Sequence, residues 1–267
     1  MGPSGNSVMA RATQPAILAS TLERGMRVLS LFRTHLTPLS LSEIAEYAAL
    51  ERSAAQRLTY TLHALGYLER DEKTRRYRPG LRTLDLAYGY LIHDRLLERA
   101  LPHMIELSRK TRTTVNLAVL DGSEVIYKAR IPRSSLSYDA ALIGVRQPAQ
   151  VTGIGQVIAA FSPPEVTQAF LAAPMPAPQT PFTSQDPDEI RAGVEGARHD
   201  GFVITSQQIM LQEIVVSAPV FGPMRQAVAG IGMPVYMPDW SVERAREELV
   251  PALTEAARTI STSVARL

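Results

Sequence analysis

Three short helical patterns between residues 20 and 66 constrain the fold most. Apolar side chains recur at helical spacing from Leu22 to Arg33, which predicts an amphipathic first helix. Ser40 and Glu43 have the spacing of a capping box, so a short second helix is expected to begin there. A third helix is expected from Arg52 to Leu65 with its leucines pointing inward, and the glycine that follows stands where helices commonly end.

A basic hairpin is predicted directly after these helices. Tyr67–Arg70 and Arg75–Arg78 have the composition of short strands, and the polar segment Asp71–Thr74 between them indicates a turn. Three helices followed by a basic hairpin are the order of elements in a winged helix-turn-helix. In that arrangement the third helix enters the DNA major groove and the hairpin lies along the flanking backbone.

The face of the third helix opposite its leucines carries polar side chains suited to reading bases. Arginine can bridge guanine O6 and N7, and glutamine can pair with adenine N6 and N7. Basic hairpin residues suit phosphate contacts, which add affinity but no sequence information. An alternative is a helical bundle with a solvated polar face. The expected base-reading residues are Arg52, Ser53, Gln56, Arg57 and Tyr60, and the expected phosphate contacts are Lys73, Arg75 and Arg76.

Charge is distributed unevenly along the 267 residues. Residues 1–95 carry 13 Lys and Arg against 9 Asp and Glu, a net of +4, whereas residues 96–267 carry 15 against 17, a net of −2. A basic N-terminal part on a nearly neutral body indicates a polyanionic partner for one domain, although basic runs also arise as solvated faces.

Several function classes lack their sequence signatures. The chain has no cysteine, which excludes disulfides and thiol nucleophiles and fits a reducing cytoplasm. No apolar stretch approaches the roughly 20 residues that span a bilayer, so no membrane partner is expected. The five histidines lack metal-ligand spacing, and neither a G-x-S-x-G elbow nor a complete dinucleotide fingerprint is present. We therefore expect no catalytic residue, no metal and no cofactor.

The C-terminal half changes to mixed strands and helices. Two strands joined by Asp121-Gly122 are expected from residue 114, since this dipeptide favours a hairpin turn. The segments GFVITS, EIVVSAPVF and AVAGIGMPVY are further strand candidates, and together with the expected helices they indicate an α/β sensor domain. The helices are expected at Glu165–Ala172, Pro187–His199 and Val242–Val264.

The runs TLERGMRVLSLF, LSLSEIAEYAALERSAAQRL, LHALGYLERD and YRPG resemble the DNA-binding domain of the IclR family of bacterial regulators. RQPAQVTGIGQVIAAF resembles that family's P-x-H-x-T/S-x-x-G-K loop and helix, with Gln150 in place of the common histidine and Gln156 in place of the common lysine. The resemblance implies a transcription regulator that binds double-stranded promoter DNA. It also implies a linker helix that pairs with a partner subunit, and hence a homodimer or homotetramer.

The fold class implied is α+β or α/β, with a winged helix-turn-helix, a linker helix and a GAF-like α/β effector-binding domain. The linker segment supports this reading, because its apolar face is wide enough for packing against a partner or its own domain. The expected boundaries are a disordered tail over residues 1–19, the DNA-binding domain over 20–80, the linker helix over 81–95 and the effector-binding domain over 96–267.

The resemblance also places a small-molecule effector beside the loop and helix that begin at Thr152, where free helix amides suit an anion. Family members that bind short keto acids tend to have an acidic residue and a Ser-x-Ser strand, and this chain has Thr205-Ser206 and Gly230-Ile231-Gly232 there. We expect a roomier, less polar pocket and an aromatic, benzoate-like organic acid. The expected effector residues are Thr152, Gly153, Ile154, Gly155, Thr205, Ser206, Val215, Ser217, Gly230 and Gly232.

Three alternatives remain open at this point. The glycines of the later strand could simply allow close strand packing. The C-terminal domain could also serve only to oligomerise a DNA-binding protein, and an enzyme is the third interpretation. A cavity of a few hundred Å³ beside Thr152 would favour the sensor, whereas a packed interior would favour the oligomerisation domain.

Overall fold

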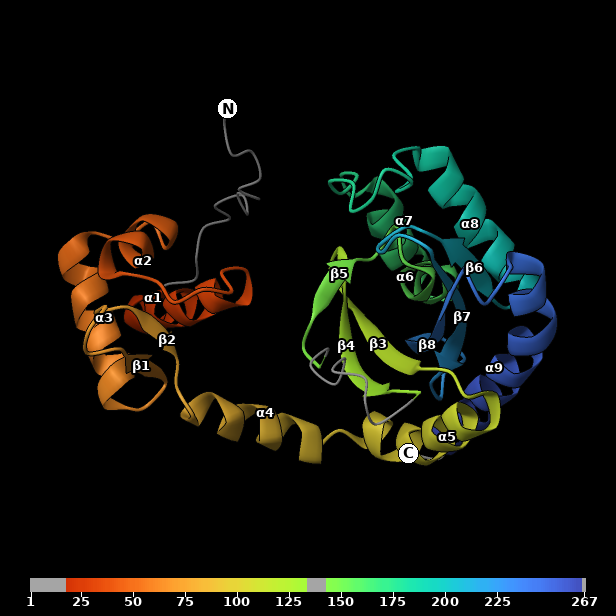
Figure 1. Cartoon of the computed structure of the whole chain (residues 1–267), viewed down its shortest axis with the longest axis horizontal. Coiled ribbons are helices and arrows are strands. Elements are labelled where there is room, and N and C mark those ends of the chain that lie inside the picture. The colour runs from red at the N-terminus through yellow and green to blue at the C-terminus, as the bar shows by residue number, and fades with distance from the viewer. Residues whose placement is uncertain (1–17, 134–142, 266–267) are drawn as a thin grey trace. The chain divides into compact units, whose positions relative to one another are not determined.

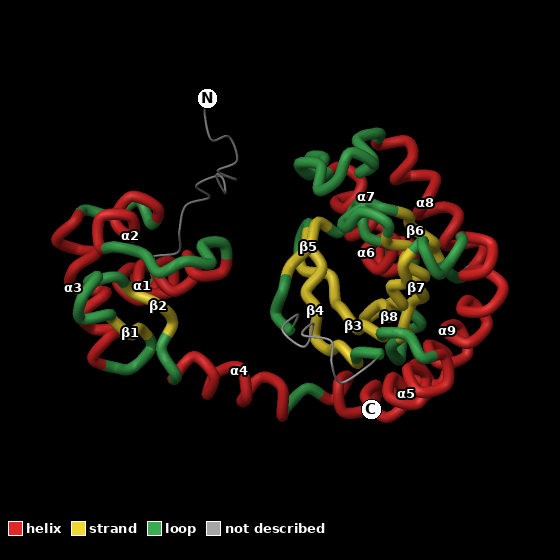
Figure 2. The backbone as a smooth tube through the Cα atoms, in the orientation of Figure 1, coloured by secondary structure: helices red, strands yellow, loops and turns green. Residues whose placement is uncertain are grey.

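The computed structural model describes residues 18–133 and 143–265. The chain forms two compact units, residues 1–93 and 94–267 (Figures 1 and 2). The expected disordered tail, residues 1–19, lies outside the described residues except for its last two. Within the described ranges, no helix is long and apolar enough to cross a membrane.

The first unit has the predicted order of three helices and a hairpin, and its fold class is confirmed. The two hairpin strands pair antiparallel, and a bridge between Leu39 and Tyr77 joins the segment before the second helix to the hairpin. The elements are α1 (Ser20–Ser30), η1 (Leu31–Arg33), α2 (Leu41–Tyr47), α3 (Arg52–Ala64), β1 (Leu68–Arg70) and β2 (Tyr77–Pro79).

Local sequence signals define the ends of these helices. Ser40 Oγ accepts a hydrogen bond from the Glu43 amide at 3.3 Å, and Glu43 Oε2 accepts one from the Ser40 amide at 2.7 Å, which is the predicted capping box. Gly66 follows the end of α3 with φ of 78°, a left-handed conformation that glycine adopts without steric cost.

A small core holds the first unit together, and one predicted member is missing from it. Leu65 is 57% exposed, so the expectation that it points inward is wrong. The helix ends at Ala64, and the turn into Gly66 carries Leu65 away from the face that Leu58 and Leu62 share. The buried apolar residues that pack together in this core are Val28, Leu39, Ile44, Ala48, Leu68 and Tyr77.

Helix α4 (Arg82–Ile92) follows the hairpin and has no buried residue. Its apolar side chains are therefore exposed within this chain, among them Leu84, Leu86 and Ile92. Gly80 precedes this helix, and a Cβ there would lie 2.2 Å from the Gly66 carbonyl oxygen, so only glycine allows the chain to leave the hairpin so close to the end of α3.

The second unit is built on one six-stranded sheet in the order β5-β4-β3-β8-β7-β6, with every neighbouring pair antiparallel. This pairing makes the unit α+β, and the strands and helices expected from the sequence are all present. The elements are α5 (Arg95–Thr111), β3 (Val115–Asp121), β4 (Glu124–Ile131), β5 (Arg146–Pro148), α6 (Gly153–Ala160), α7 (Pro164–Ala172), α8 (Pro187–Asp200), β6 (Val203–Ser206), β7 (Glu213–Phe221), β8 (Ala227–Tyr236) and α9 (Val242–Val264).

Helices cover the curled sheet on both sides. α6 packs against β7 and β8 inside the curl, while α9 packs along β7 and beside α5 on the outer side (Figure 1). Every residue of α6 is buried, because α8 and α7 in turn contact its other side. The beginning of α6 is consequently enclosed between the sheet and the loops that connect its strands.

Candidate DNA-reading surface and effector site

Helix α3 presents one continuous polar face to solvent. Ser53, Gln56, Arg57 and Tyr60 are all exposed, Tyr60 to 72%. Their spacing of three and four residues puts them on one side of the helix, and Ala55 and Thr59 are buried on the other side. Arg52 at the first position donates to Ser42 Oγ of α2 at 3.3 Å. The five predicted base-reading residues therefore share one accessible surface.

The turn of the hairpin is ordered by one carboxylate. Asp71 Oδ1 accepts hydrogen bonds from the Lys73 amide at 3.0 Å, the Thr74 amide at 2.6 Å and Thr74 Oγ1 at 2.9 Å. The bonds from Thr74, above all, hold the pKa of Asp71 below its ordinary value. Lys73 and Arg75 project from this turn as exposed side chains, as phosphate contacts require.

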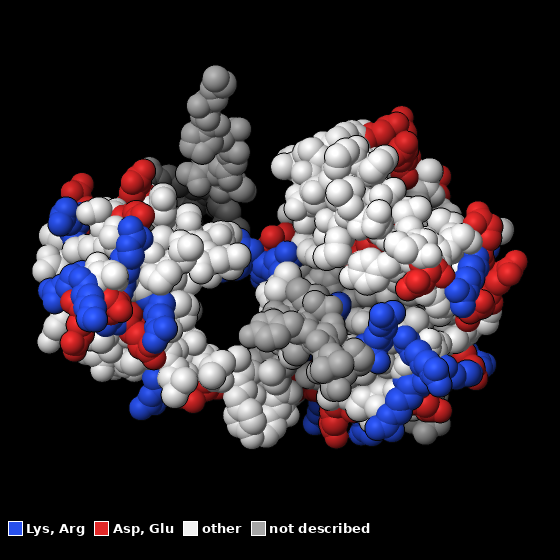
Figure 3. Space-filling model, viewed as in Figure 1, with Lys and Arg blue, Asp and Glu red and all other residues white. Residues whose placement is uncertain are grey.

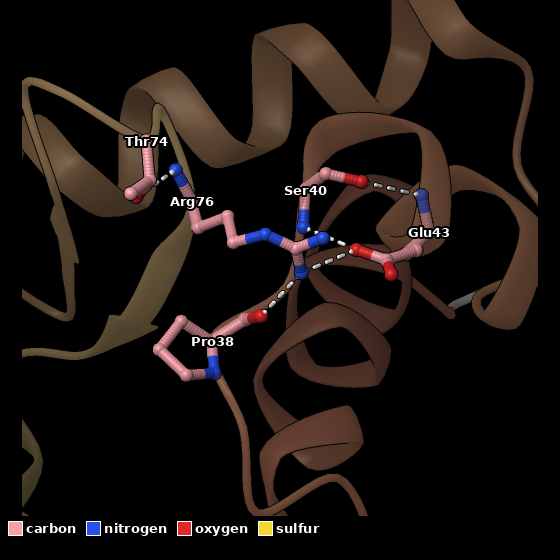
Figure 4. A network of polar contacts seen from close by, with 5 residues as sticks. All are labelled: Pro38, Ser40, Glu43, Thr74 and Arg76. Atoms are coloured by element: carbon pink, nitrogen blue, oxygen red, sulfur yellow. Dashed lines mark hydrogen bonds and ion pairs between the residues drawn. The ribbon is translucent and has the colours of Figure 1, made fainter.

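Arg76 has a different environment from the other two predicted phosphate contacts. Its Nη1 donates to the Pro38 carbonyl at 2.8 Å and to Glu43 Oε2 at 2.9 Å (Figure 4). Arg76 thus fastens the hairpin to the capping box of α2. The sequence did not show this role, because it depends on a contact between positions 33 residues apart. Within residues 18–133 and 143–265, the side chains of Lys73 and Arg75 have no such partner.

Basic and acidic side chains alternate over the visible face of the first unit (Figure 3). Part of the basic cluster is neutralised within the unit, since Arg76 pairs with Glu43 and Arg78 pairs with Glu69 at 2.8 Å. The cations without an ion pair in the described chain include Arg57, Lys73 and Arg75. These three therefore keep their full charge for a polyanion.

A small, partly open cavity of about 20 Å³ lies at the beginning of α6. Its volume holds about one water molecule. The cavity is far below the few hundred Å³ that a preformed effector pocket was expected to have. Five of the predicted effector residues line it, namely Thr152, Gly153, Ile154, Thr205 and Val215, whereas Gly155, Ser206, Ser217, Gly230 and Gly232 do not.

The glycines of β8 do not enlarge this cavity, so that expectation is wrong. A Cβ on Gly230 would lie 2.8 Å from Ile154 Cγ2, and one on Gly232 would lie 2.9 Å from Ile154 Cδ1. The space above both glycines is therefore filled by Ile154, and they allow α6 to approach the sheet. Gly155 also serves packing, because its Cβ would lie 2.1 Å from the Ala149 carbonyl oxygen.

Ser217 lies directly beneath the beginning of α6. Its side chain is fully buried, and its Oγ has no hydrogen-bond partner in the described part of the chain. A Cβ on Gly153 would lie 2.7 Å from this oxygen and 3.5 Å from Thr205 Oγ1. Thr152 caps the helix by accepting from the Gly155 amide at 3.1 Å, and the Gly153 and Ile154 amides have no acceptor within the helix. Two hydroxyls thus lie beside Gly153, at the end of α6 whose first amides have no acceptor within the helix.

Comparison with known families explains this combination of units. Residues 21–72 match the IclR helix-turn-helix domain, and residues 88–262 match the C-terminal domain of the bacterial transcriptional regulator IclR. The chain belongs to the IclR family. Members of this family are DNA-binding transcriptional regulators and not enzymes, so DNA is the partner of the first unit.

Relatives of this IclR-family chain cover nearly all of it. The HTH-type transcriptional regulator KipR of Bacillus subtilis is 27% identical over 92% of this chain and 96% of its own length. A transcriptional regulator from Rhodococcus sp. RHA1 has a structure with TM-score 0.79 and 29% identity, covering 93% of this chain and 99% of its own. An IclR homologue from Microbacterium hydrocarbonoxydans, solved with 4-hydroxybenzoate, has TM-score 0.76 and 28% identity, covering 92% and 100%.

The two glutamines of the IclR loop and helix face away from the cavity. Gln150 Nε2 donates to the Phe170 and Ala173 carbonyls, both at 3.0 Å, which ties the loop to α7. Gln156 Nε2 donates to the Gln150 carbonyl at 2.8 Å. Both side chains are buried, so they hold the loop in place instead of contacting a ligand.

Several cavity residues of this IclR-family chain were not predicted from sequence. Tyr127 OH donates to Gln147 Oε1 at 2.8 Å, and burial raises the pKa of Tyr127. Burial also raises the pKa of Glu213 to about 7, against the opposing charge of Arg130. An acidic residue at the start of the apolar run EIVVSAPVF was the available signal for Glu213. The other unpredicted lining residues are Val151, Gln207, Gln208 and Ile209.

Proposed function

We propose that α3 reads the bases of a promoter and that the hairpin turn contacts the flanking phosphates. The exposed, unobstructed face formed by Ser53, Gln56, Arg57 and Tyr60 is the observation that carries this proposal. Arg52, bonded to Ser42, is positioned at the helix start, where base edges and phosphates are both within reach. Lys73 and Arg75 supply the salt-sensitive part of the affinity.

The regulator binds DNA as a homodimer or a dimer of dimers in this proposal. Helix α4 supports it, because an isolated helix with no buried residue needs a partner for its apolar side chains. Leu84, Leu86 and Ile92 are 62%, 57% and 60% exposed. A dimer also presents two reading helices to successive turns of the same groove, which gives a small domain useful affinity.

The proposed effector is an aromatic carboxylic acid whose carboxylate binds at the beginning of α6. The free amides of Gly153 and Ile154 suit an anion at a helix N-terminus, and Ser217 Oγ and Thr205 Oγ1 lie beside them. The same cavity is lined by apolar side chains that can contact the aromatic ring, namely those of Val151, Ile154, Ile209 and Val215. The 4-hydroxybenzoate complex of the Microbacterium relative supports this class of ligand.

Effector binding requires the cavity to widen, because its present volume is too small for an aromatic acid. The segment between β6 and β7 closes it through Gln207, Gln208 and Ile209. Gln207 and Gln212 in this segment have φ values of 54° and 60°, a conformation that non-glycine residues adopt at a cost of about 1–3 kcal/mol. Outward movement of this segment would enlarge the cavity and would break the hydrogen bonds that Thr180 and Thr183 donate to the Gln207 and Gln208 carbonyls. Its position over the cavity makes it the moving part in our proposal.

The small volume of the cavity favours a second candidate function. In it, the C-terminal unit only oligomerises the regulator and binds no effector. The packed interior around Ile154 and the two β8 glycines is the observation on its side. The two candidates differ in one measurable respect, because only the first makes DNA binding respond to an organic acid.

Fluorescence anisotropy on DNA from upstream of the protein's own gene tests both parts. Titrations at two salt concentrations, with and without 4-hydroxybenzoate, benzoate, pyruvate and glyoxylate, should show salt-sensitive specific binding that aromatic acids alone change. Specific binding that no acid alters would support the oligomerisation candidate. A response to pyruvate or glyoxylate alone would contradict the aromatic effector.

A variant of the helix start makes the effector test specific. Gly153→Ala places a methyl group 2.7 Å from Ser217 Oγ and so fills the space where the carboxylate is proposed to bind. The response to the acid should disappear while DNA affinity is retained. Gly196→Ala is the matched control, because a Cβ there meets no atom within 4 Å.

A further inference from the structure

A groove of about 660 Å³ lies at the opposite end of α6 from the effector cavity. Its floor and walls come from the end of β7, the turn into β8 and the last turns of α9. Phe161, at the C-terminal end of α6, forms one wall and packs edge-on against Phe221 with ring centroids 5.1 Å apart. No residue lines both this groove and the effector cavity.

The groove exists because β6 is shorter than β7. The pairing of these strands begins at Val203 with Ser217, so no described strand pairs with the part of β7 beyond Ser217 on that side. Gly201, with φ of 78°, turns the chain from α8 into β6 at the edge of the groove. The space that a longer β6 would occupy is therefore left open, and α9 forms its other side. Pro219, within the unpaired part, has no amide to offer an added strand.

The groove combines an apolar lining with two cations. Its apolar surface comes from the two phenylalanines, from Ala218 and Pro219 of β7 and from Ala257 of α9. Arg225 of the β7–β8 turn and Arg258 of α9 also line it, and no lining residue is acidic. Within residues 18–133 and 143–265, neither guanidinium has a hydrogen bond or an ion pair. Both are available to an anion.

We propose that this groove is a second ligand site, which binds an amphipathic monocarboxylate of the medium-chain fatty acid class. The apolar chain lies against Phe161, Phe221 and Ala257, and the carboxylate is held by Arg225 and Arg258. The volume falls within the roughly 300–1,000 Å³ typical of small-molecule sites. Arginine is the residue best suited to bind a carboxylate through two parallel hydrogen bonds.

The site is independent of the effector proposed above. The eight residues of α6 separate the two sites, which corresponds to roughly 12 Å along a helix. Ligand binding in the groove is therefore measurable without DNA and without an aromatic acid. Failure of the groove proposal leaves the proposed effector site untouched, and failure of the effector proposal leaves the groove testable.

Calorimetric titration of the full chain with decanoate tests the proposal. We expect one decanoate to bind per chain. 1-Decanol, which is neutral, and decyltrimethylammonium, which is a cation, should bind at least about tenfold more weakly, because they lack the negative charge that two arginines recognise. Equal affinity for decanoate and 1-decanol would show that the groove is only a nonspecific apolar surface, and would overturn the proposed carboxylate site. Absence of any decanoate binding would overturn the site outright.

Three variants at exposed positions locate the binding. Arg225→Gln with Arg258→Gln should weaken decanoate by about tenfold or more, and Thr262→Trp should block the groove entrance without entering the core. Arg191→Gln on α8, an exposed arginine outside the groove, should leave the affinity unchanged.

Circular dichroism and light scattering complete the test. Wild-type helix content in the variants is expected, since each changed side chain is exposed. Unchanged decanoate affinity in both groove variants would overturn the assignment to this groove. A change in oligomeric state in the groove variants, without decanoate binding to the wild type, would assign the groove to a second copy of the chain and also overturn the proposal.

Discussion

Lys128 of β4 forms an ion pair with Asp94, and the two side chains are only 9% and 7% exposed. Asp94 is the first residue of the second unit and caps α5 by accepting from the Leu97 amide at 3.1 Å. Tyr127, the neighbour of Lys128 on β4, lines the effector cavity. Lys128 is the extra residue of a β-bulge, since Ala129 pairs with Leu117 and Tyr127 pairs with the next residue, Ala118, so one short stretch of β4 carries both the cavity residue and the partner of Asp94.

Removal of one partner of this buried pair should destabilise the second unit strongly. Lys128→Met leaves the Asp94 carboxylate buried without its cation, which typically costs about 3–5 kcal/mol. The single tryptophan, Trp240, lies in the second unit, so urea unfolding followed by its fluorescence reports this unit alone. Asp94→Asn combined with Lys128→Met should recover part of the loss.

An exposed ion pair provides the matched control for this prediction. Lys110 and Glu255 are paired at 3.8 Å with side chains 66% and 62% exposed. Lys110→Met should change the free energy of unfolding by less than about 1 kcal/mol, because solvent screens such pairs. Similar losses for Lys128→Met and Lys110→Met would contradict a special role for the buried pair.

The two kinds of predicted DNA contact should differ in their salt dependence. Arg57→Ala removes a base contact and should cost about 1–3 kcal/mol on the specific operator with little effect on random DNA. Lys73→Ala removes a phosphate contact, so it should weaken both DNAs and reduce the slope of log affinity against log salt by about 1. Anisotropy titrations over a salt series measure both. Equal loss on both DNAs for Arg57→Ala would exclude base reading.

Acid should loosen α2 before the rest of the first unit. Hydrogen bonding from Ser40, supported by Arg76, lowers the pKa of Glu43 below its ordinary value of 4.5. A carboxylate with a lowered folded-state pKa contributes stability that is complete above the unfolded value and is lost as pH falls through the folded value. Hydrogen exchange of α2 amides, corrected for intrinsic rates, should therefore accelerate below about pH 4.5.

Two glutamate variants separate the capping box from a general acid effect. Glu43→Gln should abolish much of the pH dependence of exchange in α2. Glu46→Gln, at an exposed position on the same helix with no partner for its side chain in the described chain, should leave it as in the wild type. Identical behaviour of the two variants would rule out the proposed role of the capping box.

The features predicted correctly from sequence are those with local causes. The capping box of Ser40 and Glu43, the glycine end of α3 and the Asp121-Gly122 hairpin each depend on residues a few positions apart. The sequence therefore specified the elements and their order. Amphipathic spacing also identified the exposed face of α3, since the opposite face is the one that packs.

The errors arise where distant segments meet. Whether Gly230 and Gly232 open a pocket or admit a side chain depends on Ile154, more than seventy residues earlier. In the sequence, Arg76 does not differ from the other cations of the hairpin. Only the folded structure shows that it binds Glu43 and the Pro38 carbonyl. The sheet likewise brings Glu213 to a cavity whose other residues come from four separate segments, and no local pattern contains that information.

The second unit should be more stable toward acid than its glutamate content suggests. Burial raises the folded-state pKa of Glu213 from 4.5 to about 7. The native state then binds more protons than the unfolded state between these values, so stability falls as pH rises through this window. The loss approaches roughly 3 kcal/mol at most, given 1.36 kcal/mol per pKa unit.

Glu213→Gln should remove this pH dependence and stabilise the unit at pH 8. Urea midpoints from Trp240 fluorescence between pH 5 and 8 measure the effect. Glu247→Gln, at an exposed position of α9, is the control and should follow the wild type. A wild-type midpoint that does not fall between pH 5 and 7 would show that the Glu213 carboxyl is already ionised in the folded state.

The substitution Ser217→Ala should have different effects on the free energy of unfolding and on the affinity for the ligand. Its Oγ is buried without a partner in the described chain, so Ser217→Ala removes an unsatisfied hydroxyl and should leave stability unchanged or raise it by about 1 kcal/mol. Ser108, whose Oγ donates to the Thr113 carbonyl at 2.8 Å, is the matched control, and Ser108→Ala should lose about 1 kcal/mol. Calorimetry with 4-hydroxybenzoate should show weaker binding to Ser217→Ala only. A hydroxyl that serves only packing would not combine equal or greater stability of the alanine variant with weaker ligand binding, so that combination would identify the Ser217 hydroxyl as a ligand contact.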